Sequence, residues 1–208
     1  VGQTIGEGLV VDFSRYMDRI LELNVEERWA WVEPGIVRDV LHHALKPHGL
    51  HFAPDPATSS RATVGGMIAN NSSGTRSLRY GKTLDHVLEL RVLLADGTVL
   101  HSRDIDAAQR TALKMDHGRE AEILRELTRI VDEQRDEIEI RFPKVMRRVG
   151  GYNLDEFLGE TWNLSKLFTG SEGTLGIILS AKIHLEPLPA HQSICVVHFS
   201  EFFESISH

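Results

Sequence analysis

Residues 54–81 read PDPATSSRATVGGMIANNSSGTRSLRYG. Hydrophobic periodicity disappears in this stretch, and its Pro, Asp, Thr, Ser, Asn and Gly residues predict one long loop from Phe52 to Gly81. An ordered loop of this length inside a compact domain usually has a function. The adjacent glycines Gly65 and Gly66 allow the backbone to approach a ligand closely, and free N–H groups beside them would form an anion site.

The polar residues of this loop restrict the anion that it would hold. Thr63 and the pair Ser72-Ser73 add hydroxyl donors, but the loop contains no Lys. It therefore lacks the pattern of a triphosphate-binding loop and fits a diphosphate held by amides and hydroxyls better. Taken alone, however, a glycine pair more often marks a turn that only connects two elements.

A second glycine-rich turn is predicted at residues 170–178, which read GSEGTLGII. From Ile177 to Leu185 apolar and polar residues alternate strictly, which predicts a strand with one exposed face that ends before Pro187. The remaining pattern predicts strands at 9–13, 28–33, 87–94, 99–100 and 193–199, and helices at 16–23, 37–45 and 120–137. We therefore expect the α+β class, with a mixed or antiparallel sheet flanked by helices and with strands in the majority.

Composition excludes several classes of partner. The 208 residues are 41% hydrophobic and carry a net charge of −7, which argues against nucleic acid or an anionic membrane surface. No apolar run approaches the roughly 20 residues that span a bilayer. The single Cys195 excludes intramolecular disulfides and favours a reducing compartment. We expect a cytoplasmic protein, membrane-associated at most through an electron-transfer partner.

Four histidines, His42, His43, His48 and His51, lie within ten residues of one another. His42 and His43 are helix neighbours that point in different directions, and no carboxylate or Cys completes a ligand set. We expect surface and turn histidines here, and no metal site.

The motifs become specific when they are read together. PDP (54–56), ATVGG (62–66), NSSG (71–74), YG (80–81) and GSEGTLGII (170–178) occur in that order. This order resembles the FAD-linked oxidases of the vanillyl-alcohol oxidase superfamily, with their FAD-binding PCMH-type domain. The group that it resembles most is the D-2-hydroxyacid dehydrogenases, which include D-lactate dehydrogenase, the glycolate oxidase flavin subunit and D-2-hydroxyglutarate dehydrogenase.

The resemblance implies a set of residues that contact FAD or border its cavity. These are Pro54, Asp55, Thr63, Val64, Gly65, Gly66, Asn71, Ser72, Ser73, Gly74, Tyr80, Gly81, Glu172, Gly173, Gly176, Ile177 and Ile178. Main-chain groups near Ile178 would reach the adenine. Neither motif places a His or Cys where a covalent tether would form, so FAD should bind non-covalently.

The resemblance also implies a domain organisation. Residues 1–189 would form the FAD-binding domain and residues 190–208 the start of a substrate-binding cap. The family's first glycine-rich loop would lie upstream, with only its tail at Val1-Gly2-Gln3, so the N-terminal subdomain is expected to be incomplete. MRRVGGY (146–152) is similar to long members fused to an iron–sulfur domain. That likeness implies a fused or partner iron–sulfur protein outside this chain.

The expected function is FAD-dependent oxidation of a small 2-hydroxy acid of D configuration by hydride transfer to the flavin. The catalytic base and the electron acceptor are not identified, because the residues that hold the substrate would lie in the cap. Residues 1–208 alone are expected to be inactive. Two alternatives stay open: a flavin oxidase of another alcohol or alditol, and a non-catalytic nucleotide-binding module.

Overall fold

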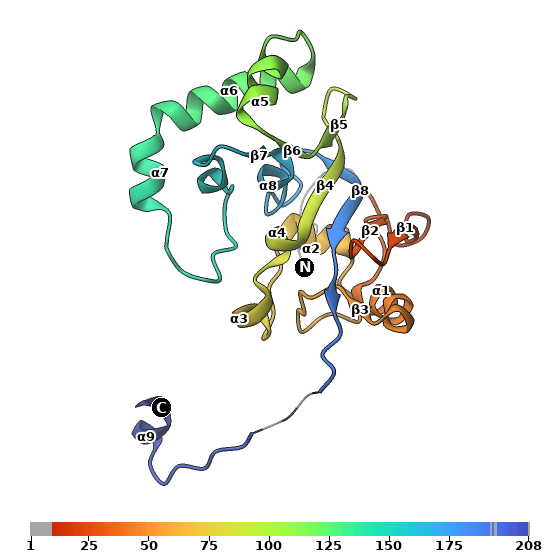
Figure 1. The fold of residues 1–208 in the computed structure, drawn as a ribbon, viewed down its shortest axis with the longest axis vertical. Helices are drawn as coiled ribbons and strands as arrows, with labels where there is room; N and C mark the ends of the chain where they lie inside the picture. The colour runs from red at the N-terminus through yellow and green to blue at the C-terminus, as the bar shows by residue number, and fades with distance from the viewer. Residues whose placement is uncertain (1–9, 192, 194, 208) are drawn as a thin grey trace.

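A computed structural model describes residues 10–191, 193 and 195–207. At its centre is a five-stranded antiparallel sheet (Figure 1). Its strands lie in the order β1 (Ile20–Asn24), β2 (Trp29–Val32), β8 (Ile177–His184), β4 (Val87–Leu93) and β5 (Val99–Ser102). Two short antiparallel pairs flank it: β3 (Leu50–His51) with β9 (Glu186–Pro187), and β6 (Asp104–Ile105) with β7 (Trp162–Asn163).

Helices surround the sheet and connect its strands. They are α1 (Arg38–Leu45), α2 (Val64–Asn70), α3 (Ser77–Tyr80), α4 (Thr83–His86), α5 (Ala107–Lys114), α6 (Arg119–Glu133), α7 (Arg135–Arg141), α8 (Leu164–Phe168) and α9 (Phe202–Ser207), with 3-10 turns at Lys46–His48 and Leu154–Phe157. The described residues include more helix than strand. The α+β class is thus confirmed, whereas the expected majority of strands is wrong.

The apolar core lies between the sheet and helices α1, α2 and α6. The inward residues Ala181 and Ile183 of β8, and Leu185 directly after it, are fully buried, as the alternation predicted. Between β4 and β8 the register shifts where Arg91 pairs with Ser180 but Val92 pairs with Ile178. This irregularity interrupts the alternation, and Ile177 is 38% exposed.

Three predicted elements differ in the structure. The prediction of a helix at 16–23 is wrong, because β1 occupies the second half of this range and pairs with β2. The described residues of the predicted strands 9–13 and 193–199 form no strand, and Leu9 and Ile194 lie outside the described residues. The predicted loop 52–81 contains α2 and α3, which are too short to produce a hydrophobic period.

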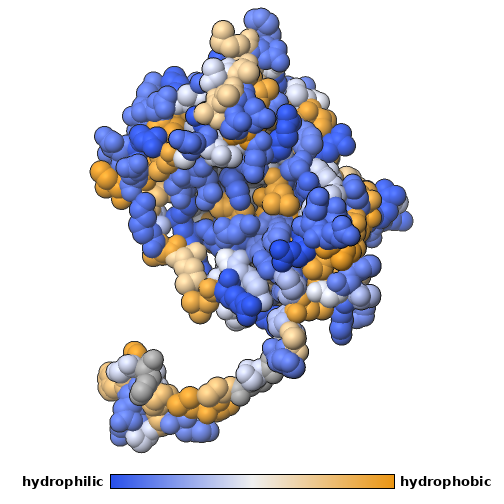
Figure 2. All heavy atoms as spheres, viewed as in Figure 1, coloured by the Kyte–Doolittle hydropathy of each residue, from blue (hydrophilic) through white to orange (hydrophobic). Residues whose placement is uncertain are grey.

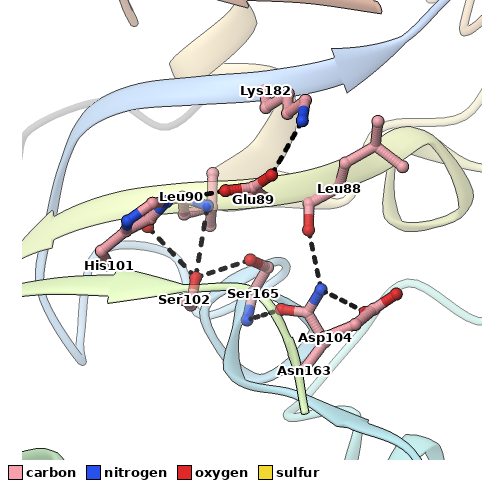
Figure 3. Close-up of polar contacts among 9 residues, drawn as sticks. All are labelled: Leu88, Glu89, Leu90, His101, Ser102, Asp104, Asn163, Ser165 and Lys182. Atoms are coloured by element: carbon pink, nitrogen blue, oxygen red, sulfur yellow. Dashed lines mark hydrogen bonds and ion pairs between the residues drawn. The ribbon is translucent and has the colours of Figure 1, made fainter. Parts of the chain in front are cut away.

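A buried polar network fixes α8 against the sheet (Figure 3). The hydroxyls of Ser102 and Ser165 lie 2.6 Å apart. The Asn163 amide donates to the Leu88 carbonyl at 2.7 Å and to Asp104 at 2.8 Å. Because α8 leads directly into residues 170–178, this network also sets the position of the second glycine-rich turn.

The chain beyond β9 extends away from the sheet (Figure 1). Figure 2 shows apolar side chains along this segment, among them the exposed Val196, Val197, Phe202 and Phe203. Among the described residues, no helix is both long enough and apolar enough to cross a membrane.

Candidate functional site

Helix α2 begins where the first glycine motif begins. Thr63 has extended backbone angles and is the N-cap, and its hydroxyl oxygen accepts the N–H of Gly66 at 3.3 Å. A polar side chain at this position satisfies an N–H that has no partner within the helix. The sequence VGGMIAN therefore folds as two turns of helix rather than as a loop.

The first N–H groups of α2 are occupied. The N–H of Val64 donates to Ile36 and that of Gly65 donates to Pro34, at 2.9 and 2.8 Å. With the Gly66 N–H bound to Thr63, the predicted open row of N–H groups is not formed at these three residues. This part of the prediction is wrong, because the turn after β2 supplies carbonyls that sequence spacing does not reveal.

The C-terminal end of α2 is bonded to the second glycine-rich turn. The N–H of Gly170 donates to Ile68 and that of Glu172 donates to Ala69, both at 2.9 Å. The Asn70 amide also donates to the Glu172 carboxylate at 2.7 Å. Two stretches about 100 residues apart in the sequence are therefore held as one unit.

A cavity of about 350 Å³ lies between these two motifs. Seven residues predicted from the sequence line it: Thr63, Gly65, Gly66, Gly173, Gly176, Ile177 and Ile178. Its other walls are Val11, Asp12, Phe13, Ser14, Pro34, Ala69, Phe168 and Ser171. Aromatic and aliphatic side chains beside a few hydroxyls suit a planar ring system with a polar substituent.

A second cavity of about 300 Å³ shares the walls Thr63 and Gly66 with the first. Its lining is completed by Thr58, Arg61, Ala62, Met67 and Ser72. The two cavities meet at Thr63 and Gly66 in the N-terminal turn of α2, and we call them together the trough.

Glycine is needed at Gly66 and Gly173 for different reasons. A Cβ at Gly66 would lie 3.1 Å from the Thr63 hydroxyl oxygen, and otherwise it would enter open space at the trough. Gly173 has a φ of +78°, which L-residues rarely adopt. Both glycines therefore keep the trough open, and the residues present fit a dinucleotide.

The remaining predicted residues do not line the first cavity. Asp55 accepts hydrogen bonds from the Thr75 hydroxyl at 3.3 Å and from the Arg76 N–H at 3.2 Å. Gly74 packs so closely against Asp55 that a Cβ there is excluded. Asp55 thus organises the backbone of residues 74–76. Of the other residues, Pro54, Val64, Asn71, Ser73, Tyr80, Gly81 and Glu172 lie outside both cavities of the trough.

Asn71 and Tyr80 are positioned by neighbouring elements. Asn71 is fully buried with a φ of +49°, and its side-chain oxygen caps α4 by accepting the Leu84 N–H at 2.9 Å. The Tyr80 carbonyl lies 2.7 Å from the ring nitrogen Nε2 of the buried His86. Tyr80 also contacts His51 edge to face, with ring centroids 5.5 Å apart. These contacts indicate structural roles for both residues.

The prediction that the four histidines lie at the surface or in turns is wrong for His51. His51 is buried, neither ring nitrogen has a partner among the described residues, and burial lowers its pKa to about 4. Burial also lowers the pKa of His42. No group of three or more His, Cys, Asp or Glu residues able to hold a metal occurs in the described ranges.

Several walls of the first cavity were not predicted. Ser171 lies inside the second glycine motif, and Pro34 belongs to a Pro-Gly turn, so both carried a signal that sequence reasoning could have used. Phe168 belongs to the run Leu167–Gly170 that leads into the second glycine motif and is similar to the same family, whereas Phe13 carried no such signal. The hydroxyl and N–H of Ser14 bind Asp12 and hold the pKa of that carboxyl below its usual value, so Asp12 brings a negative charge to this cavity.

Comparisons with known proteins agree with this geometry. Residues 1–103 match the family model described as FAD binding domain. D-2-hydroxyglutarate dehydrogenase of Pseudomonas putida is 45% identical over 99% of this chain and 21% of its own length. Glycolate oxidase subunit GlcD of Bacillus subtilis is 31% identical over 88% of this chain and 28% of its own length.

A likeness among solved structures supports the fold. Alkyldihydroxyacetonephosphate synthase superposes with a TM-score of 0.53 at 21% identity, over 85% of this chain and 23% of its own. The chain thus spans about a fifth to a quarter of the length of these relatives. By the match over residues 1–103, this part of the chain belongs to the family described as FAD binding domain.

Proposed function

We propose that this chain is the FAD-binding part of an enzyme that oxidises a D-2-hydroxy acid to the 2-oxo acid. The observation that carries the proposal is the trough, where the two glycine motifs meet although they lie about 100 residues apart. The similarity to D-2-hydroxyglutarate dehydrogenase extends over 99% of the chain and supports this substrate class.

In the proposed complex FAD lies along the trough. Phe13, Phe168 and Ile178 would offer apolar contacts to one ring system, and Thr63 and Gly66 would lie beside the middle of the cofactor. The residues proposed to contact FAD are Thr63, Gly65, Gly66, Ser72, Gly173, Gly176, Ile177 and Ile178. Asp55, Asn71 and Glu172 would help to keep these in place through the contacts described above.

Bound FAD would accept the hydride from the carbon that bears the hydroxyl. The proton of that hydroxyl must pass to a base, and we place this base and the substrate-binding residues beyond residues 1–189, in the proposed cap. The electrons then pass to an acceptor outside this chain, which the resemblance to long family members suggests is a fused or partner iron–sulfur protein. The two glycine motifs would hold FAD in place while it is reduced by the substrate and reoxidised by the acceptor.

The test is anaerobic reduction of the flavin in the full-length protein that contains this chain, by D-2-hydroxyglutarate, D-lactate and glycolate, followed by its absorbance. We expect bleaching by a D-2-hydroxy acid and none by the L-enantiomer. Bleaching only by alditols or simple alcohols would favour a different oxidase. A protein that binds FAD but is reduced by none of these compounds would indicate a non-catalytic nucleotide-binding module.

A further inference from the structure

Arg61 is the cation among the described walls of the trough. It lines the second cavity, where the other walls are the neutral residues Thr58, Ala62, Thr63, Gly66, Met67 and Ser72. Its guanidinium makes no ion pair or hydrogen bond with any residue that the structure describes. An Arg side chain offers five N–H donors in a planar fork that matches the oxygens of a phosphate group.

The backbone that carries Arg61 is fixed without help from its side chain. The N–H of Arg61 donates to Thr58 at 2.8 Å, and the Ala62 carbonyl accepts the Arg38 N–H at 2.9 Å. The N–H of Asp39 donates to the carbonyl of Ser59, two residues before Arg61. The carboxylate of Asp39 is already bound by the Ser59 hydroxyl and by Arg38. The turn is thus held against α1, and the guanidinium is left available.

The diphosphate of FAD needs donors that α2 does not offer. The N–H groups of Val64, Gly65 and Gly66 are all occupied. The first cavity has no cation among its described walls, so nothing described there would balance the charge of a diphosphate. The second cavity carries the positive charge of Arg61 and the hydroxyl of Thr58, whereas the Ser72 hydroxyl donates to the Asn70 side chain. The charge distribution therefore places the diphosphate in the second cavity.

We propose that Arg61 binds the diphosphate of FAD in the second cavity. This inference rests on the proposed function only in taking FAD as the ligand of the trough. It adds a cation to a site for which the sequence motifs suggested only amides and hydroxyls.

The test uses purified protein from which the flavin has been removed, titrated with FAD, ADP and riboflavin. We expect Arg61→Gln to weaken both FAD and ADP by about ten- to a hundredfold, the loss that one or two charge-assisted hydrogen bonds would cause. Riboflavin has no phosphate and should bind equally to both proteins. Arg61→Lys, which keeps the charge but loses the fork, should fall between wild type and Arg61→Gln.

Arg103→Gln is the matched control, because it removes the same charge from an exposed residue outside the trough. Equal melting temperatures of the flavin-free proteins would show that each variant is folded. Unchanged FAD and ADP affinity in Arg61→Gln would overturn the proposal, as would a loss confined to riboflavin, which would place the guanidinium at the flavin ring. A wild type that binds FAD but oxidises no 2-hydroxy acid would refute the proposed function and leave this inference standing.

Discussion

The two adjacent glycines of the first motif should respond very differently to the same substitution. A Cβ at Gly65 would lie 2.5 Å from the Pro34 ring carbon and 2.9 Å from the Pro34 carbonyl oxygen. A Cβ at Gly66 would touch only the Thr63 hydroxyl oxygen, at 3.1 Å. We therefore expect Gly65→Ala to destabilise the fold and Gly66→Ala to act mainly on the cofactor.

The magnitudes follow from these contacts. Overpacking against a rigid neighbour costs about 1–3 kcal/mol, and losing the bond from the Gly65 N–H to Pro34 costs about 0.5–1.5 kcal/mol more. Replacing a helical Gly by Ala returns about 0.5–1 kcal/mol. Gly65→Ala should thus lose roughly 1–3.5 kcal/mol, or about 2–14 °C in melting temperature for a domain of this size. In Gly66→Ala the gain in helix propensity should offset the free-energy cost of the 3.1 Å contact between the new Cβ and the Thr63 hydroxyl oxygen.

The assay is thermal unfolding of the flavin-free proteins by circular dichroism, since bound FAD would itself raise the melting temperature. FAD titration of the same samples then measures the cofactor site. We expect Gly66→Ala to keep the wild-type melting temperature but to bind FAD more weakly, because its Cβ projects into the trough. A Gly65→Ala protein that melts with wild type would show that α2 does not depend on its contact with Pro34.

Three further outcomes are expected. Asn163→Ala should lower the free energy of unfolding by about 1–3 kcal/mol, because it leaves the buried Ser165 N–H and the half-buried Leu88 carbonyl of the network in Figure 3 without a partner; an unchanged urea midpoint would contradict this. The pKa of His51 is lowered to about 4 from 6.5, so the unfolded chain binds a proton first as pH falls. Stability should therefore decline from about pH 6.5 towards pH 4, and His51→Phe should reduce that slope in denaturant titrations; an equal slope in both proteins would assign it to other groups. Acid precipitation should release all the flavin, since no His, Cys or Tyr is among the described walls of the trough, and a yellow pellet would reveal a covalent bond.

The amino-acid sequence by itself determined the class and the cofactor. Long elements with a clear period, such as β4, β8 and the region of α6, could be predicted because their burial repeats at fixed spacing. The ordered motifs from residue 54 to residue 178 indicated FAD through their resemblance to FAD-linked oxidases, whereas their glycines by themselves indicated only a close approach of the backbone to a ligand. Both kinds of signal depend on residues that are close in the sequence, so they can be recognised without knowing the tertiary structure.

Only the tertiary structure decided how the site is built. Helix α2 forms within a stretch that reads as a loop, because its stability comes from packing and from the Thr63 cap rather than from propensity. Its N–H groups are taken by carbonyls of Pro34 and Ile36, about 30 residues away in the sequence. The walls of the trough come from separate segments that meet only when the sheet has formed. Only the tertiary structure shows that the Arg61 guanidinium has no partner among the described residues.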